Sequence, residues 1–212
     1  MLDRTVRRME LSEFDHFYAC IENDFPVGEY APHQVMKGQV SRGLQEGWVY
    51  QEGEQALGYA FCAAGHPNDC VLLSFFAIHK PYRKHGIGSE FLAALNRKYD
   101  HKRTMLVEVE KPELSETENE RIVRNNRIAF YGKAGYRQIP AIEYVIWDVP
   151  MHLMAAPLAA EWPWIVQHVG QIIYDINEML MGQRYMHHMK FVRLKGQDAT
   201  RSQQNRTESN ND

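Results

Sequence analysis

The segment Val71–His79 is apolar at almost every position, and this run restricts the possible folds more than any other feature of the chain. Such a run is typical of a strand covered on both faces, because a strand with one face in water alternates apolar and polar residues. We therefore expect this strand at the centre of a sheet. The segment after it contains Gly86 and Gly88 and leads into apolar residues at helical spacing from Ile87 to Tyr99.

Strand-like and helix-like patterns alternate along the rest of the chain. Further strands are expected at Thr5–Met9, 48–51, 56–64, 104–110, 136–149 with an interruption at Pro140, and 151–154. Further helices are expected after an N-cap at Ser12, around Val35–Leu44, from the capping box Thr117–Glu120 to a stop at Gly135, and from Pro163. The order predicts an α/β (α+β) fold with a mixed, mostly antiparallel twisted sheet flanked by helices.

The overall composition excludes several classes of protein. The chain of 212 residues has 24 basic and 27 acidic side chains, and this balance favours neither nucleic acid nor an anionic membrane as a partner. No signal-like segment and no apolar run of about 18 residues is found, so we expect a cytoplasmic protein. Three cysteines and ten histidines show no metal-ligand spacing, and no metal is predicted.

The glycine-containing segment between the apolar strand and the helix has the features of an anion site. Glycines allow close approach of a ligand to the backbone, and the first amides of a helix lack partners within the helix. Arg83 and Lys84 add positive charge. A GxxxxGK[ST] motif is absent, and the third glycine of a dinucleotide fingerprint is missing. The pattern predicts a phosphate or pyrophosphate ligand, although a glycine turn that only starts a helix has the same local sequence.

A second motif, Ala129–Tyr136, follows about 40 residues later. The pair of motifs, Arg-x-x-Gly-x-Gly and Ala-Phe-Tyr-Gly-Lys-Ala-Gly-Tyr, resembles the GNAT superfamily of GCN5-related N-acetyltransferases. The resemblance covers residues 4–155 and implies transfer of an acetyl group from acetyl-CoA to a primary amine by direct attack in a ternary complex. It also implies that the cofactor is held by Ala77, Ile78, Arg83, Lys84, His85, Gly86, Ile87 and Gly88.

The resemblance also implies the catalytic groups. Tyr131 would protonate the departing CoA thiolate, and a tyrosine keeps its proton at neutral pH. Glu108 is our choice for the base that removes a proton from the amine. It shares one face of a strand with Glu110, and the alternative is that one or both carboxylates are solvated or form ion pairs. The chain departs from the family pattern at Arg124 and Arg127, where many members have asparagine and alanine.

The substrate side is less defined by the sequence. Glu29 and Tyr30 lie in a proline-containing loop and are the candidate grip on a cationic amine, with a plain solvated loop as the alternative. We expect residues 1–155 to form the transferase domain, 156–195 a helical extension packed on that domain or at a homodimer interface, and 196–212 a disordered tail. The alternative functions are a non-catalytic acyl-CoA-binding regulatory module and a module that binds another nucleotide.

Overall fold

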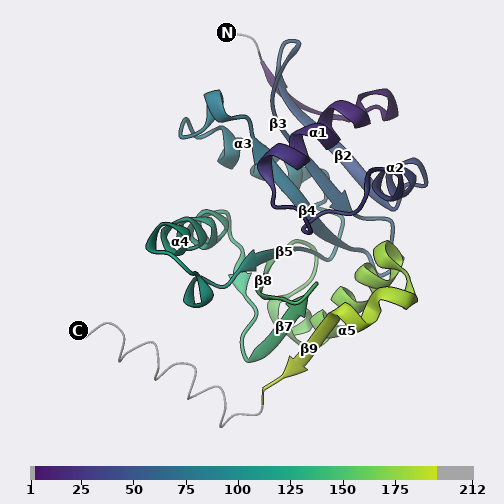
Figure 1. Cartoon of the computed structure of the whole chain (residues 1–212), viewed down its shortest axis with the longest axis vertical. Helices are drawn as coiled ribbons and strands as arrows, with labels where there is room; N and C mark the ends of the chain where they lie inside the picture. The colour runs from purple at the N-terminus through teal and green to yellow at the C-terminus, as the bar shows by residue number, and fades with distance from the viewer. Residues whose placement is uncertain (1–2, 195–212) are drawn as a thin grey trace.

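The computed structural model describes residues 3–194, in which a mixed sheet carries helices on both of its faces (Figure 1). The strands are β1 Arg4–Arg8, β2 Gln45–Glu52, β3 Gln55–Ala63, β4 Cys70–Ile78, β5 Thr104–Glu110, β6 Arg137–Gln138, β7 Ile142–Ile146, β8 Val149–Pro157 and β9 Met189–Arg193. The α-helices are α1 Phe14–Asp24, α2 His33–Ser41, α3 Ile87–Lys98, α4 Glu118–Lys133 and α5 Trp162–Met181. Short 3₁₀ helices occupy Leu11–Glu13, Lys80–Tyr82, Pro112–Leu114 and Gln183–His188.

The strands follow the order β1-β2-β3-β4-β5-β8-β7-β9, and β6 pairs with β8. Strands β4 and β5 run parallel, whereas the other paired neighbours run antiparallel. This arrangement confirms the predicted mixed, mostly antiparallel sheet flanked by helices, with a further helix near the C-terminus. None of the helices within residues 3–194 combines the length and the hydropathy needed to span a lipid bilayer.

The sheet is split between its two parallel strands. Residues Cys70–Leu72 of β4 pair with Thr104–Leu106 of β5, but from there to their carboxyl ends the two strands no longer pair with each other. Strand β4 also bulges at Ser74, because Phe61 of β3 lies opposite Phe75 while Cys62 lies opposite Leu73. The carboxyl half of β4 therefore has backbone groups that β5 does not use, and the glycine-containing loop follows after the short 3₁₀ helix Lys80–Tyr82.

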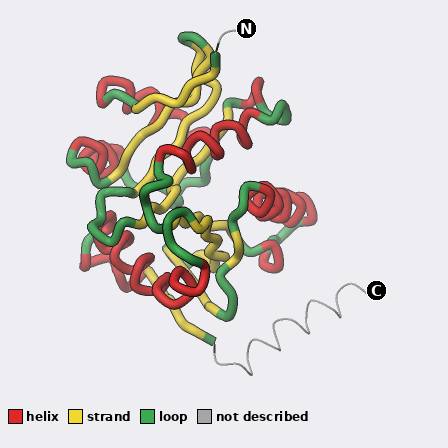
Figure 2. Tube along the Cα trace, turned by 180° about the vertical axis from the view of Figure 1, so that it is seen from behind, coloured by secondary structure: helices red, strands yellow, loops and turns green. Residues whose placement is uncertain are grey.

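Alternation along β3 shows how the helices are divided between the two faces. Tyr59 and Phe61 pack with α1 and α2, and Ala63 packs with α5, so these three helices cover one face. Ala60 and Cys62 point the other way, into a cluster with α3 and α4. Figure 1 shows α3 and α4 on one side of the sheet with α2 and α5 on the other, and Figure 2 shows the same layers from behind. Helix α5 thus packs its apolar stripe on the sheet of its own chain.

Local sequence chemistry explains most element ends. The Thr117 hydroxyl caps α4 by accepting a hydrogen bond from the Glu120 amide at 3.2 Å, and Gly135 beyond its end has a φ of +90°. At the first helix the predicted cap at Ser12 is wrong. Glu10 caps a short 3₁₀ turn there in a capping box with Glu13, because the Glu13 carboxylate reaches the Glu10 amide.

Several elements differ from the sequence-based boundaries. The second helix ends at Ser41, and strand β2 already begins at Gln45. The expected long strand over 136–149 is divided into β6 and β7, and β8 extends from Val149 to Pro157. Strand β9, which pairs with β7 at the edge of the sheet, was not predicted. The expected disordered tail, 196–212, lies outside the described residues.

Candidate functional site

The loop from Arg83 to Gly88 offers a run of unpaired backbone amides at the carboxyl end of β4. The amides of residues 84–88 donate no hydrogen bond within residues 3–194, whereas Ser89 and Glu90 already bond to the Gly86 carbonyl. Gly86 has a φ of +78° and Lys84 one of +68°, so the backbone of the loop is left-handed at two positions. The loop can therefore receive an anion without any change in its internal hydrogen bonds.

The side chains of the loop have different environments. Lys84 and His85 are exposed, Ile87 is buried in the core below α3, and Gly88 lies in the first turn of α3. A Cβ at Gly88 would meet Ile78 and Phe130 at 3.5 Å, which is ordinary contact. A ligand that approaches the loop therefore meets its backbone and the exposed side chains of Lys84 and His85.

The guanidinium of Arg83 is already bound by groups of the protein. Its Nη2 atom lies 2.9 Å from Asp24 Oδ1, and its Nε atom donates to the Ile78 carbonyl at 2.6 Å. The Tyr59 hydroxyl donates to the other Asp24 oxygen at 3.2 Å. The guanidinium therefore links the end of α1 to the end of β4, and it occupies the carbonyl of Ile78. Ala77 precedes Ile78 on the unpaired half of β4, and both residues are buried.

Tyr131 lies on α4 and is almost completely buried, with 8% of its surface exposed. Its ring packs near Phe130 and Tyr136, at centroid distances of 5.2 and 5.4 Å. Burial raises the pKa of Tyr131 to about 12, and the positive charge of Arg127 opposes part of that rise. Its hydroxyl has no hydrogen-bond partner within residues 3–194, so its proton is free for a ligand.

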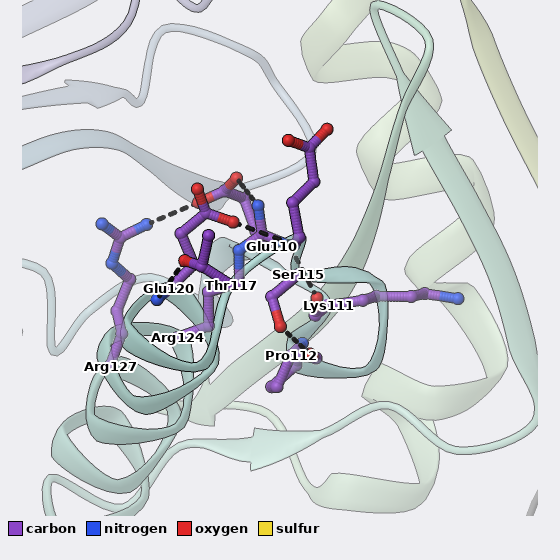
Figure 3. A network of polar contacts seen from close by, with 9 residues as sticks. Glu110, Lys111, Pro112, Ser115, Thr117, Glu120, Arg124 and Arg127 are labelled. Carbon is purple, nitrogen blue, oxygen red and sulfur yellow. Dashed lines mark hydrogen bonds and ion pairs between the residues drawn. The ribbon is translucent and has the colours of Figure 1, made fainter.

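Glu108 and Glu110 have different partners although they are two residues apart on β5. Glu110 is held by two arginines of α4, with Arg124 Nη2 at 2.8 Å and Arg127 Nη1 at 3.4 Å, and Figure 3 shows both pointing at it. Arg124 also donates to the Lys111 carbonyl at 3.0 Å. The ion-paired interpretation therefore describes Glu110, and the arginines that replace the family's asparagine and alanine are its partners.

Glu108 makes no ion pair within residues 3–194. Its Oε1 atom accepts a hydrogen bond from the Tyr144 hydroxyl at 2.5 Å, and the Asn177 side-chain amide donates to that hydroxyl at 3.3 Å. Burial raises the pKa of Glu108, and the hydrogen bond from Tyr144 opposes this. A carboxylate with a raised pKa and a neutral donor is suited to accept a proton near neutral pH.

The predicted substrate residues Glu29 and Tyr30 lie in the loop between α1 and α2. Burial raises the pKa of the half-buried Glu29, the Glu110 carboxylate adds to the rise, and Arg127 and Arg124 oppose it. Tyr30 packs edge-on against Tyr18 of α1, at 5.9 Å between ring centroids. Glu29 is thus within electrostatic reach of Glu110 and its two arginines, while Tyr30 packs the loop against α1.

Sequence reasoning missed two groups of this region. Asn177 was not considered, although a polar residue inside the apolar stripe of α5 is a recognisable departure from the pattern. Asp24 was not considered either, because its pairing with Arg83 joins segments 59 residues apart. The link between Tyr144 and Glu108 also joins segments distant in sequence, 36 residues apart. No group of three metal-ligating side chains comes together within residues 3–194.

Comparisons with known proteins agree with this geometry. Residues 44–138 match a family model described as an acetyltransferase (GNAT) domain. Among solved structures, a GNAT-family acetyltransferase from Bacteroides thetaiotaomicron has a TM-score of 0.68 at 19% identity and covers 84% of this chain and 98% of its own. The ribosomal-protein-S18-alanine N-acetyltransferase from Escherichia coli has a TM-score of 0.55 at 18% identity, with coverages of 75% and 96%.

A third solved structure is a spermidine N-acetyltransferase from Vibrio cholerae in complex with CoA and spermine. It has a TM-score of 0.55 at 8% identity and covers 74% of this chain and 96% of its own. A comparison of the sequence with curated proteins finds no match. The chain therefore has the fold of these acetyltransferases. Its residues 44–138 form a segment of the GNAT acetyltransferase family, as the two motifs predict.

Proposed function

We propose that the chain is an acetyl-CoA-dependent N-acetyltransferase that transfers an acetyl group to a primary amine by direct attack in a ternary complex. The observation that carries the proposal is the run of unpaired amides at residues 84–88, close to the half of β4 that does not pair with β5. Such amides suit a pyrophosphate, and the strand edge that β5 leaves unpaired suits the amide groups of a pantetheine arm. The cofactor-binding groups are those predicted from residues 77 to 88, with Arg83 acting through Asp24 as a brace.

Two side chains supply the proton transfers that the reaction needs. Glu108 takes a proton from the attacking amine, because its carboxylate is withdrawn from water and has no cation beside it. Tyr131 gives its proton to the thiolate that leaves when the carbon–sulfur bond breaks, because its hydroxyl is protonated at neutral pH and has no partner within residues 3–194. The two transfers balance: one proton leaves the amine and one reaches the thiol.

The acceptor enters from the side of the α1–α2 loop in this proposal. Glu110 is already paired with Arg124 and Arg127, whereas Glu29 makes no ion pair within residues 3–194. The Glu29 carboxylate is therefore available to a cationic group of the acceptor, and an amine with a second positive charge is the preferred class. We assign residues 1–155 to the transferase domain and 156–195 to an extension, which contributes α5 and adds strand β9, Met189–Arg193, to the same sheet.

The test is thiol release from acetyl-CoA with a panel of amines: a polyamine, an aminoglycoside, an amino acid and a short peptide. We expect release with at least one amine, and the strongest release with one carrying two or more positive charges. Binding of acetyl-CoA by calorimetry without thiol release on any amine would instead support a non-catalytic acyl-CoA-binding module. That alternative is favoured by the engagement of Arg124 with Glu110 at the family's asparagine position.

A further inference from the structure

Glu108 is held by residues from two elements that lie outside the matched segment 44–138. Tyr144 is on β7 and is fully buried, and Asn177 is on α5 with 5% of its surface exposed. Leu106, two residues before Glu108 on the same strand face, packs in the cluster of α5. The carboxyl group therefore points toward the face of the sheet that the C-terminal helix covers.

The hydrogen bonds of this group form a directed chain. The Asn177 Nδ2 atom donates to the Ile173 carbonyl at 3.0 Å and to the Tyr144 hydroxyl oxygen at 3.3 Å. The bond to Ile173 anchors the amide to the helix backbone. Because the hydroxyl oxygen of Tyr144 accepts from Asn177, its single proton is left to point at Glu108, where the distance between the oxygens is 2.5 Å. A hydrogen bond to a charged acceptor is short and strong.

We propose that Tyr144 and Asn177 are positioning residues that fix the orientation of the Glu108 carboxylate for the acceptor amine, so that helix α5 is part of the catalytic machinery. This inference rests on the proposed function. A carboxylate with only a structural role would be stabilised more by a cation, as Glu110 is by Arg124 and Arg127. The neutral donor leaves Glu108 able to gain and lose a proton, which an ion pair would resist.

The charged groups on the neighbouring elements make no hydrogen bond or ion pair with Glu108. On β8, His152 lies 3.2 Å from Glu113, and on β7, Glu143 lies 3.1 Å from Lys190. The remaining titratable groups nearby on α5 are Tyr174, Asp175 and Glu178, and Asp175 accepts from Gln171 at 2.6 Å. The proton affinity of Glu108 is raised by burial and lowered by Tyr144, with no contribution from these groups.

The test measures the titration of Glu108 in the full chain by NMR of ¹³C-labelled glutamate carboxyl groups, with Glu108→Gln to assign the signal. In Tyr144→Phe the midpoint should rise by about one to two pH units, because the charged form loses a strong hydrogen bond. Asn177→Leu should move it in the same direction by less. Tyr174→Phe is the matched control, since it removes from α5 a tyrosine hydroxyl that makes no hydrogen bond to Glu108, Tyr144 or Asn177, and it should leave the midpoint unchanged.

The pH midpoint of the acid limb of kcat/KM should shift in the same order: most in Tyr144→Phe, less in Asn177→Leu and not in Tyr174→Phe. An unchanged midpoint in Tyr144→Phe, with the fold retained by circular dichroism, would overturn the inference even in a chain that shows no transfer. Conversely, a shifted midpoint with no thiol release from any amine would leave the hydrogen-bonded chain standing and count against the proposed function. A midpoint and an acid limb that both shift support the two together.

Discussion

Replacing Tyr131 by phenylalanine removes one hydroxyl group and leaves the ring in place. That hydroxyl has no partner within residues 3–194, and the ring keeps its contacts with Phe130 and Tyr136, so the free energy of unfolding should change by less than about 0.5 kcal/mol. The turnover should fall by about 10²- to 10⁴-fold, the usual contribution of a general acid. This corresponds to about 3 to 5 kcal/mol of transition-state stabilisation.

The assay is thiol release at saturating acetyl-CoA, with calorimetry for the Kd of acetyl-CoA and urea unfolding for stability. Tyr136→Phe is the matched control, because its hydroxyl donates to Asn96 Oδ1 at 3.0 Å. That variant should lose about 1 kcal/mol of stability and keep its turnover. Since burial raises the pKa of Tyr131 to about 12, its ionisation should leave the parent pH profile unaffected below about pH 11. Equal turnover in Tyr131→Phe, or loss of acetyl-CoA binding, would refute the assigned role.

Two further variants test the base and the anion loop. Glu108→Gln should abolish turnover yet be more stable than the parent at pH 8. Because the folded-state pKa of Glu108 is raised, the stability that its protonated form gives the parent is present at acid pH and lost as the pH rises. The stability advantage of the variant in urea unfolding should therefore vanish below about pH 4. Gly86→Val should weaken acetyl-CoA binding in calorimetry and cost about 1 to 2 kcal/mol, because Gly86 has a φ of +78°. Gly132→Ala, within α4, is its control and should leave binding unchanged; equal binding in Gly86→Val would count against the loop as the anion site.

The elements that sequence patterns predicted well are those decided by neighbours along the chain. The apolar composition of β4, the left-handed glycine before α3 and the cap at Thr117 each depend on a few adjacent residues. Strand β9 was missed because its five residues show no strong alternation of apolar and polar side chains. Its extended conformation is stabilised by pairing with β7. The Ser12 cap failed for a similar reason: a nearby Glu10–Glu13 pair competes for the same amides.

The roles of Glu108 and Glu110 show where a local pattern stops being informative. A period of two places both carboxylates on one face of a strand, and it gives them equal claims to be the base. The difference arises from partners 14 to 36 residues further along the chain: arginines of α4 reach Glu110, whereas the hydroxyl of Tyr144 reaches Glu108. An ion pair favours the charged form of a carboxylate, and burial disfavours it. Of the two, Glu108 is therefore the group whose environment makes proton uptake from an amine favourable, and this environment depends on a helix that the two motifs do not include.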